Sequence, residues 1–290
     1  MKIVYHFFQK FTLPNKGNEK FLLIWFNKGM KIKALLPTYP IINNKKTSNF
    51  GSNSRVYCSK LTNYKRMETT SWMFREDIDW SFLACYLEDH FKDKEKVQIL
   101  NPACSDGSEA YSLIIMLKEQ MQEKSEKFFP IKAYDIDDEI LRSANSGFLN
   151  TNFMDRTNIR RFAENSYDYF RFTNRKLEIM WDRDREWQEG TITMKATKKL
   201  TKNVIFNKGD MREVLKNHND ESNTVLMCRN VFGHLGRDFT EKFIKQASEK
   251  LKKDSLLVIG KYDEKIIGIK EILQNYGFRE INRNIYLKTT

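Results

Sequence analysis

Apolar residues in the middle of this chain change their spacing in a way that predicts helices alternating with buried strands. A short apolar run at 97–100 indicates a strand, and the small-residue segment 101–107, NPACSDG, follows it. Apolar residues then recur at helical spacing over 110–117. Upstream, the segment 79–91 places four large apolar side chains on one helical face, namely Trp80, Leu83, Leu87 and Phe91. The predicted order is helix, strand, turn, helix.

The same alternation continues towards the C-terminus. Residues 131–137, IKAYDID, predict a second strand that ends in acidic residues, and a helix-like segment follows it. We expect a helix face at 239–251 and one last strand at 277–289. Three further strands are expected at NVIF, TVLMC and SLLVIG (203–206, 224–228 and 255–260). Strands that alternate with helices are typical of an α/β fold.

The turn after the first strand is a candidate ligand site. Ala103, Ser105 and Gly107 have small side chains, which let a ligand approach the backbone amides at the start of the next helix. A turn of this kind is by itself more often plain α/β packing. The acidic residues at the end of the second strand favour a ligand site over plain packing. In nucleotide-binding α/β units, an acid at this place accepts hydrogen bonds from ribose hydroxyls.

Two acids compete for the ribose role. Asp135 ends the predicted second strand, whereas Asp137 is placed to cap the following helix, a position that favours Asp. The segment DIDDE does not form a calcium loop, because the required Gly and the Glu at the twelfth position are absent at that spacing. We therefore expect Asp135 to be the ribose ligand.

Charge divides the chain at about residue 70. The full chain of 290 residues has a net charge of +12. Its first 70 residues carry 13 Lys or Arg and two acids, whereas the remainder is nearly neutral. Residues 1–69 are therefore expected to form a basic, largely irregular leader with weak, salt-dependent affinity for anionic surfaces. Met30 is an alternative natural start. The body at 70–290 has no bias towards nucleic acid.

Size and cysteine usage set further limits. With 40% hydrophobic residues, the chain can bury one substantial core and a small appendage. The four cysteines are widely spaced and show no metal-ligand pairing, which is typical of a reduced, cytoplasmic protein without a metal site. Its apolar runs are too short to span a bilayer, so no transmembrane segment is expected.

From about Thr70 onwards the chain resembles the CheR-type chemotaxis receptor methyltransferases, which use S-adenosylmethionine. Four blocks match the family's motifs in order. They are TSWMFRE at 70–76, with one extra residue before the Arg, ACSDGSEAYS at 103–112, the AYDID segment that runs from 133 to 148, and MCRNVFGHL at 227–235. The resemblance implies a Rossmann-like class I methyltransferase sheet with helices on both faces.

The resemblance also implies a function and its site. It implies methyl transfer from S-adenosylmethionine to a protein acceptor with carboxylate side chains, such as a chemoreceptor glutamate. Arg75 and His234 are the catalytic candidates, and Arg75 is favoured because its planar fork matches a carboxylate; the alternative is an ordinary surface Arg. The expected cofactor-binding residues are Ala103, Ser105, Gly107, Glu109, Asp135, Asp210, Asn230 and Val231.

Some of these roles come from the family alone. Glu109 is expected near the methionine ammonium; otherwise it is an ordinary acid in the first turn of a helix. Asp210 follows the strand on the adenine side, where its carboxylate can accept from the amino group. The family usually has Glu at Ser108, Tyr at His234 and Phe at Leu235. His234 could orient a substrate oxygen or mark a changed substrate or lost activity.

Two alternatives stay open. The segment 167–206 corresponds to a small antiparallel β appendage that can grip a receptor tail in the family, but a hairpin without a partner is an equal interpretation. The chain as a whole is either an active methyltransferase or a cofactor-binding regulatory or docking module that has lost turnover. A binding titration with the cofactor and its demethylated product is the single experiment that would be most informative.

Overall fold

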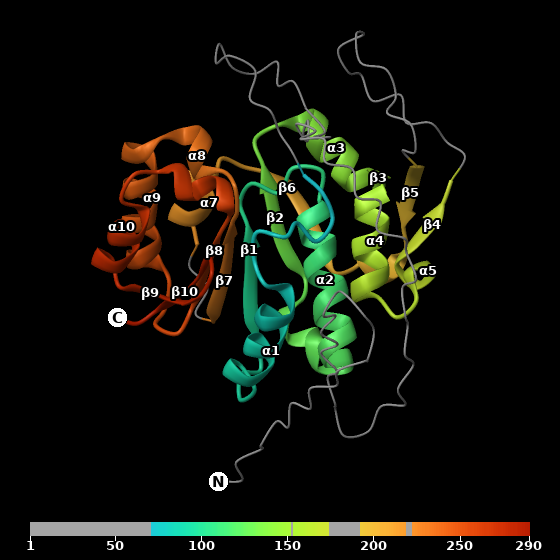
Figure 1. Cartoon of the computed structure of the whole chain (residues 1–290), viewed down its shortest axis with the longest axis horizontal. Helices are drawn as coiled ribbons and strands as arrows, with labels where there is room; N and C mark the ends of the chain where they lie inside the picture. The colour runs from blue at the N-terminus through green and yellow to red at the C-terminus, as the bar shows by residue number, and fades with distance from the viewer. Residues whose placement is uncertain (1–70, 152, 174–191, 219–221) are drawn as a thin grey trace, which may run out of the picture. The chain divides into compact units, whose positions relative to one another are not determined.

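A seven-stranded mixed sheet forms the centre of the computed structural model, which describes residues 71–151, 153–173, 192–218 and 222–290 (Figure 1). The strand order is β6-β2-β1-β7-β8-β10-β9. The first five are mutually parallel, and β10 runs antiparallel to both β8 and β9. The bounds are β1 Val97–Asn101, β2 Ile131–Asp135, β6 Val204–Lys208, β7 Asn223–Cys228, β8 Leu256–Ile259, β9 Phe278–Asn282 and β10 Ile285–Lys288.

The central strands of the sheet are completely buried. Every residue of β1, β7 and β8 is buried. Parallel strands covered by helices on both faces are expected to have this character. The predicted α/β fold is thereby confirmed, including the strands at 97–100, 203–206, 224–228 and 255–260, and the strand predicted at 131–137 ends at Asp135.

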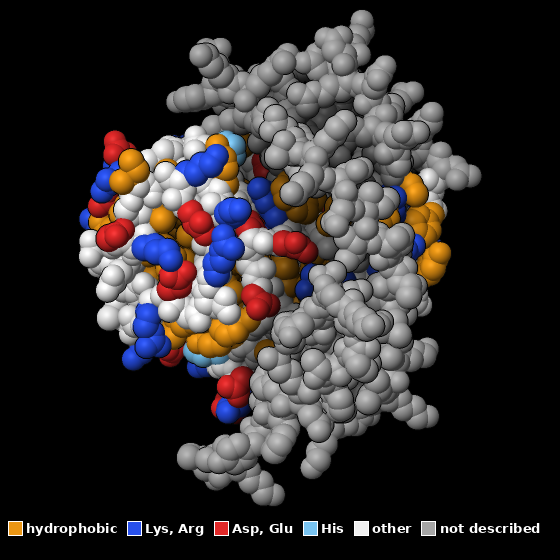
Figure 2. Space-filling view, viewed as in Figure 1, with side chains coloured by type: hydrophobic (Ala, Val, Ile, Leu, Met, Phe, Trp, Pro, Cys, Tyr) orange, Lys and Arg blue, Asp and Glu red, His pale blue; other side chains and the backbone are white. Residues whose placement is uncertain are grey.

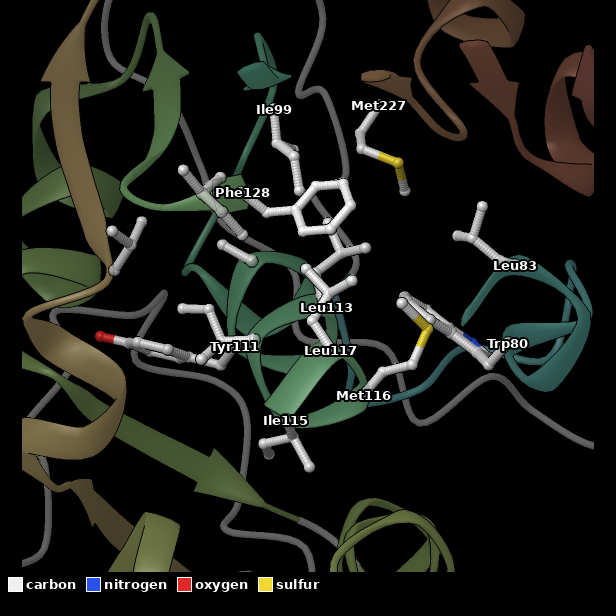
Figure 3. Packing of buried hydrophobic residues seen from close by; sticks show 14 of the residues in the cluster. Trp80, Leu83, Ile99, Tyr111, Leu113, Ile115, Met116, Leu117, Phe128 and Met227 are labelled. Carbon is white, nitrogen blue, oxygen red and sulfur yellow. The ribbon is translucent and has the colours of Figure 1, made fainter. Parts of the chain in front are cut away.

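Helices cover both faces of the sheet and enclose two apolar cores. One core contains side chains of α1 (Trp80–His90) and α2 (Ser108–Met121), and the other contains those of α7 (Met211–Lys216), α9 (Arg237–Lys250) and α10 (Ile269–Asn275). Figure 3 shows the first core, with Trp80 of α1 beside Met116 of α2. The remaining elements are η1 Gln122–Phe128, α3 Asp138–Ser146, α4 Phe153–Phe162, α5 Ser166–Tyr169, α6 Lys198–Thr201, α8 Phe232–Leu235 and η2 Lys261–Lys265.

Two aspartates begin helices in the way that their sequence positions predict. Asp79 caps α1 by accepting a hydrogen bond from the Phe82 N–H at 2.9 Å. Asp137 caps α3 by accepting from the N–H groups of Glu139 and Ile140. The capping prediction for Asp137 is therefore confirmed, and Asp135 is left as the acid at the end of β2.

A separate three-stranded antiparallel sheet forms the appendage, in the order β3-β5-β4. Its strands are β3 Phe148–Thr151, β5 Ile192–Ala196 and β4 Phe170–Phe172. The expected range 167–206 differs from this in two ways. It omits β3, and its last run, 203–206, belongs to β6 of the main sheet. Residues 174–191 of the expected range lie outside the described residues, as does the basic leader at 1–69.

The C-terminus differs from the single strand expected at 277–289. It forms a hairpin of β9 and β10, in which Ile285 pairs with Asn282. Asn284 takes a left-handed conformation with φ of +62°, which Asn tolerates better than most residues. The turn reverses the chain at Arg283 and Asn284, two polar residues inside the segment predicted as one strand.

The surface agrees with the nearly neutral charge of the body. On the face in Figure 2, basic and acidic side chains are interspersed over the described residues. None of the helices in the described ranges is long and apolar enough to cross a membrane. Within those same ranges, no three His, Cys, Asp or Glu side chains gather as metal ligands.

Candidate functional site

The loop between β1 and α2 is held in a conformation that needs small residues. Cys104 N–H donates to the carbonyl of Tyr134 at 2.8 Å, which ties the loop to β2. Ser105 has a φ of +51°, and Gly107, the cap of α2, has a φ of +85°. A Cβ at Gly107 would lie only 2.7 Å from Cζ of Phe206. Both the backbone conformation and the aromatic neighbour therefore require glycine there.

Asp135 joins this loop to the end of β2. Its Oδ2 accepts the Ser105 N–H at 2.8 Å, and its Oδ1 accepts the Asp137 N–H at 3.1 Å. Burial raises the pKa of this carboxyl, while the backbone donors act in the opposite direction. A carboxylate oxygen has two lone pairs, so each oxygen can accept one more hydrogen bond. The carboxylate thus fixes the loop and still has acceptor capacity for a ligand hydroxyl.

Arg229 is the centre of a buried ionic cluster at the end of β7. Its side chain is only 1% exposed. Its Nη1 donates to Glu109 Oε2 at 2.7 Å, and its Nη2 donates to the Asp77 carboxylate and, at 2.9 Å, to the Arg75 carbonyl. The guanidinium also lies over the ring of Trp80, 4.8 Å from its centroid. These contacts join α2, β7 and the segment before α1.

The charges of this cluster act on one another because water is largely excluded. Burial raises the pKa of Glu109, although Arg229 opposes the shift. Burial acts in the same direction on Asp77, but Arg229 and the hydrogen bond from Asn230 hold the pKa of Asp77 below its usual value. Burial would lower the pKa of Arg229, yet Glu109 and Asp77 raise it. Arg229 is therefore a permanent cation between two carboxylates.

Arg75 lies at the rim of the same cluster. Its Nε is 3.6 Å from Asp77 Oδ2, and its guanidinium stacks 4.1 Å from the centroid of the Trp72 ring. Burial lowers the pKa of Arg75, although Asp77 opposes the shift. The side chain of Arg75 is 22% exposed, so this residue lies at the partly exposed rim of the cluster.

Asn230 follows Arg229 in a strained left-handed conformation with φ of +60°. Its N–H donates to Asp263 Oδ2 at 2.7 Å, its Nδ2 donates to Asp77, and its Oδ1 accepts from the Tyr262 N–H at 2.9 Å. A Cβ on Gly260 would lie 2.3 Å from Asn230 Cγ, so that glycine makes room for the amide. Every polar group of this side chain is engaged, which over-determines its position.

Asp263 holds the whole turn after β7. Besides Asn230, it accepts from the N–H groups of Phe232, Gly233 and Gly260 at 2.7–3.2 Å. Burial raises the pKa of Asp263 to about 6, against the effect of these four donors. The carboxylate satisfies four backbone donors at the start of α8 and η2 that would otherwise be buried without partners.

The remaining predicted residues lie on the loops near Asp135 and near the Arg229 cluster. Val231 and the half-buried Ala103 lie on the loops after β7 and β1. Asp210 caps α7 and pairs with Arg212, and the preceding Gly209 N–H donates to the Asp135 carbonyl at 2.9 Å. His234 is exposed on α8 and stacks on Tyr262 with ring centroids 4.6 Å apart.

The structure thus brings most predicted residues to the carboxyl ends of β1, β2, β6 and β7. Ser105, Gly107 and Asp135 form one group, and Arg75, Glu109 and Asn230 meet around Arg229. Sequence reasoning missed Asp77 and Asp263. Asp77 gives no signal because its partner Arg229 is 152 residues away. Asp263 sits in the charged run KYDEK, which resembles a solvated surface, although the nearby Gly260 marks a turn.

Buried polar side-chain atoms without hydrogen-bond partners gather at the same place. Among the described residues, such atoms occur on Asn101 at the end of β1, on Ser105 and Ser108 around the α2 start, and on Arg229 at Nε. The two other examples are in the β10 hairpin, on Asn284 and Tyr286. Native proteins leave few such groups, and a cluster of them is typical of a site that completes its hydrogen bonds with a ligand.

Comparison with known proteins identifies the family to which this chain is similar. The family model described as CheR methyltransferase, SAM binding domain, matches residues 69–280. Two curated relatives are named chemotaxis protein methyltransferase. The protein of Listeria monocytogenes is 23% identical over 216 residues, which cover 73% of this chain and 68% of the relative. The protein of Listeria innocua is 23% identical over 198 residues, which cover 67% of this chain and 62% of the relative, less than two thirds of its length.

Among solved structures, monomeric WbdD aligns with 72% of this chain and 40% of its own, at 12% identity and a TM-score of 0.39. The fold assignment rests instead on the strand order, in which five parallel strands are followed by an antiparallel hairpin, and on the family match.

Proposed function

Because this chain belongs to the CheR methyltransferase family, whose cofactor is S-adenosylmethionine, we propose that it methylates carboxylate side chains of a protein acceptor of the chemotaxis-receptor kind. The names of the two Listeria relatives support the acceptor class. The observation that carries the proposal is the cluster of unpartnered buried polar atoms between Asp135 and the Arg229 cluster. It lies at the carboxyl ends of parallel strands, where open α/β sheets bind ligands.

The residues present fit the cofactor. Asp135 has acceptor capacity for the ribose hydroxyls, and the neighbouring loop places only small residues, Ser105 and Gly107, beside it. The side chain of Glu109 is 16% exposed and offers a negative charge to the methionine ammonium. Asp210 lies past the end of β6. Its carboxylate caps α7 and would in addition accept a hydrogen bond from the adenine amino group. When bound, S-adenosylmethionine supplies a methyl group on a positively charged sulfur.

The chain needs no general base for this reaction. A glutamate acceptor is already ionised at neutral pH, since its ordinary pKa is about 4.3. The protein must therefore orient the acceptor oxygen and exclude water, and such positioning effects are large. Arg75, at the partly exposed rim of the cluster, would hold the acceptor carboxylate. His234 and the stacked Tyr262 would form the neighbouring wall of the acceptor side.

A two-step experiment tests the proposal. Calorimetry with S-adenosylmethionine and S-adenosylhomocysteine should show binding of both to the full chain. Labelled cofactor should then transfer its methyl group to a chemoreceptor-like acidic acceptor, and mild base should release the label as methanol. Label that resists base would contradict ester formation. Binding without transfer to any acidic acceptor would favour a regulatory or docking module.

A further inference from the structure

Asp77 is a buried acid in the segment between Arg75 and α1. Its side chain is 4% exposed, and its carbonyl accepts from Asn284 Nδ2 at 3.0 Å. The Asn284 contact fixes this part of the chain against the β9–β10 hairpin. The carboxylate of Asp77 consequently has a fixed position relative to the end of β7.

The two carboxylate oxygens of Asp77 serve different partners. Oδ1 accepts from Arg229 Nη2, and Oδ2 accepts from Asn230 Nδ2. Asp77 therefore holds two successive residues of the turn after β7, and its Oδ2 also faces Arg75 Nε at 3.6 Å.

Arg229 has two anionic partners that differ in exposure. Asp77 is 4% exposed, whereas Glu109 is 16% exposed and lies in the first turn of α2, next to the cofactor loop. A buried guanidinium is strongly destabilising when it loses its counter-ion. If Glu109 were its single partner, Arg229 would hold that carboxylate and would repel an incoming ammonium.

We propose that Asp77 is a positioning residue, the permanent counter-ion of Arg229, and that it leaves Glu109 available for the amino group of the cofactor. This inference rests on the proposed function, because it assigns Glu109 to the ammonium. Asp77 acts through Arg229 and Glu109, and it touches neither the cofactor nor the acceptor. Because it acts on Glu109 through Arg229, its main effect on binding should fall on the amino-acid part of the ligand.

Ligand pairs that differ in this part test the proposal. S-Adenosylhomocysteine carries the amino acid, whereas 5′-methylthioadenosine has the same nucleoside without it. Asp77→Asn, which keeps the shape and removes the charge, should raise the Kd for S-adenosylhomocysteine roughly tenfold or more. The Kd for 5′-methylthioadenosine should change less than about twofold. Both constants are measured by calorimetry on the full chain.

Asp79→Asn is the matched control. Asp79 lies two residues away and caps α1, a role that Asn performs equally well. Both ligands should bind this variant as they bind the wild type. Asp77→Glu keeps the charge and should retain the wild-type ratio of the two constants. If Asp77→Asn does not fold, the ratio of the two Kd values measured for Asp77→Glu tests the proposal.

The outcomes separate the two proposals. Equal losses of both ligands in Asp77→Asn, or no loss of either, would overturn the role of Asp77 while leaving the methyltransferase proposal intact. A changed ratio in Asp77→Glu would likewise contradict a role that depends on charge. Failure of the wild-type chain to bind either ligand would instead overturn the proposed function, and the inference with it.

Discussion

The carboxylate of Asp135 and the backbone N–H of Ser105 are joined by a 2.8 Å hydrogen bond across 30 residues of sequence. The bond links the end of β2 to the loop after β1, so the acid that would meet the ribose also shapes the loop that would meet the rest of the cofactor. A change at Asp135 should therefore affect ligand binding more than global stability.

Asp135→Ala should weaken S-adenosylmethionine binding by about 1.5–3 kcal/mol, the cost of losing a hydrogen bond to a charged group. Calorimetry measures this change. Asp137→Asn is the control, because Asn retains the cap of α3 and Asp137 is the competing acid. Unchanged affinity in Asp135→Ala, or a larger loss in the control, would assign the ribose contact elsewhere.

Gly107→Ala should destabilise the fold through two separate effects. The left-handed backbone costs about 1–2 kcal/mol for a residue with a Cβ, and the 2.7 Å approach to Phe206 adds overpacking of about 1–3 kcal/mol. Gly268→Ala is a matched control, since Gly268 also caps a helix in the left-handed region, with its nearest neighbour at 3.7 Å. Urea unfolding should show the larger loss for Gly107→Ala. Equal losses would contradict a steric role for Phe206.

Local patterns and family motifs predicted much of this molecule. The β1–loop–α2 unit follows from a change of hydrophobic period, and the cap at Asp137 follows from its place before a helix. The family and the cofactor are confirmed by the match over residues 69–280. The roles of the individual site residues stay predictions. Short-range signals were sufficient where the determining contacts lie within one helix turn or one strand.

Other features depend on contacts that no local pattern carries. The hairpin turns at the polar triplet Asn282-Arg283-Asn284, without a Gly or Pro to mark it. The four-residue strand β3 is stabilised by pairing with β5, more than 40 residues later. Asp77 and Asp263 gain their hydrogen-bond partners only when folding brings the turn after β7 against them. Such tertiary contacts override local propensity.

His234 offers a test of the acceptor side. Its ring stacks on Tyr262 at 25° between the ring planes, an arrangement that a tyrosine could keep. His234→Tyr should therefore maintain or raise turnover on a chemoreceptor-like acceptor, whereas His234→Ala should lower it roughly 2- to 12-fold, as expected for one lost hydrogen bond.

The control is His90→Ala. His90 also stacks on a tyrosine, with its ring centroid 4.9 Å from that of Tyr86, but it bonds the carbonyl of Asp254, which precedes β8 at the amino end of that strand. Turnover should be unchanged in this variant. If both substitutions of His234 leave turnover at the wild-type level, this side chain does not touch the reacting groups.

Asp263 should make stability depend on pH in a direction unusual for an aspartate. Its pKa is about 6 in the folded protein, against 3.8 as the ordinary value. Because the folded state binds the proton more tightly, the stabilisation is fully present below pH 3.8 and is lost as the pH rises through 6. Between pH 5 and 7.5 the free energy of unfolding should fall by about 1.4 kcal/mol from this group alone.

Urea unfolding at several pH values checks this expectation, with Asp263→Asn as the reference. The variant lacks one acceptor for the backbone N–H groups of the β7 turn, so it should be less stable than the wild type at every pH. Its profile should nevertheless lack the decline between pH 5 and 7.5, since no carboxyl titrates at that position. Parallel profiles would show that the four amide donors keep Asp263 ionised throughout, and that burial does not decide its charge.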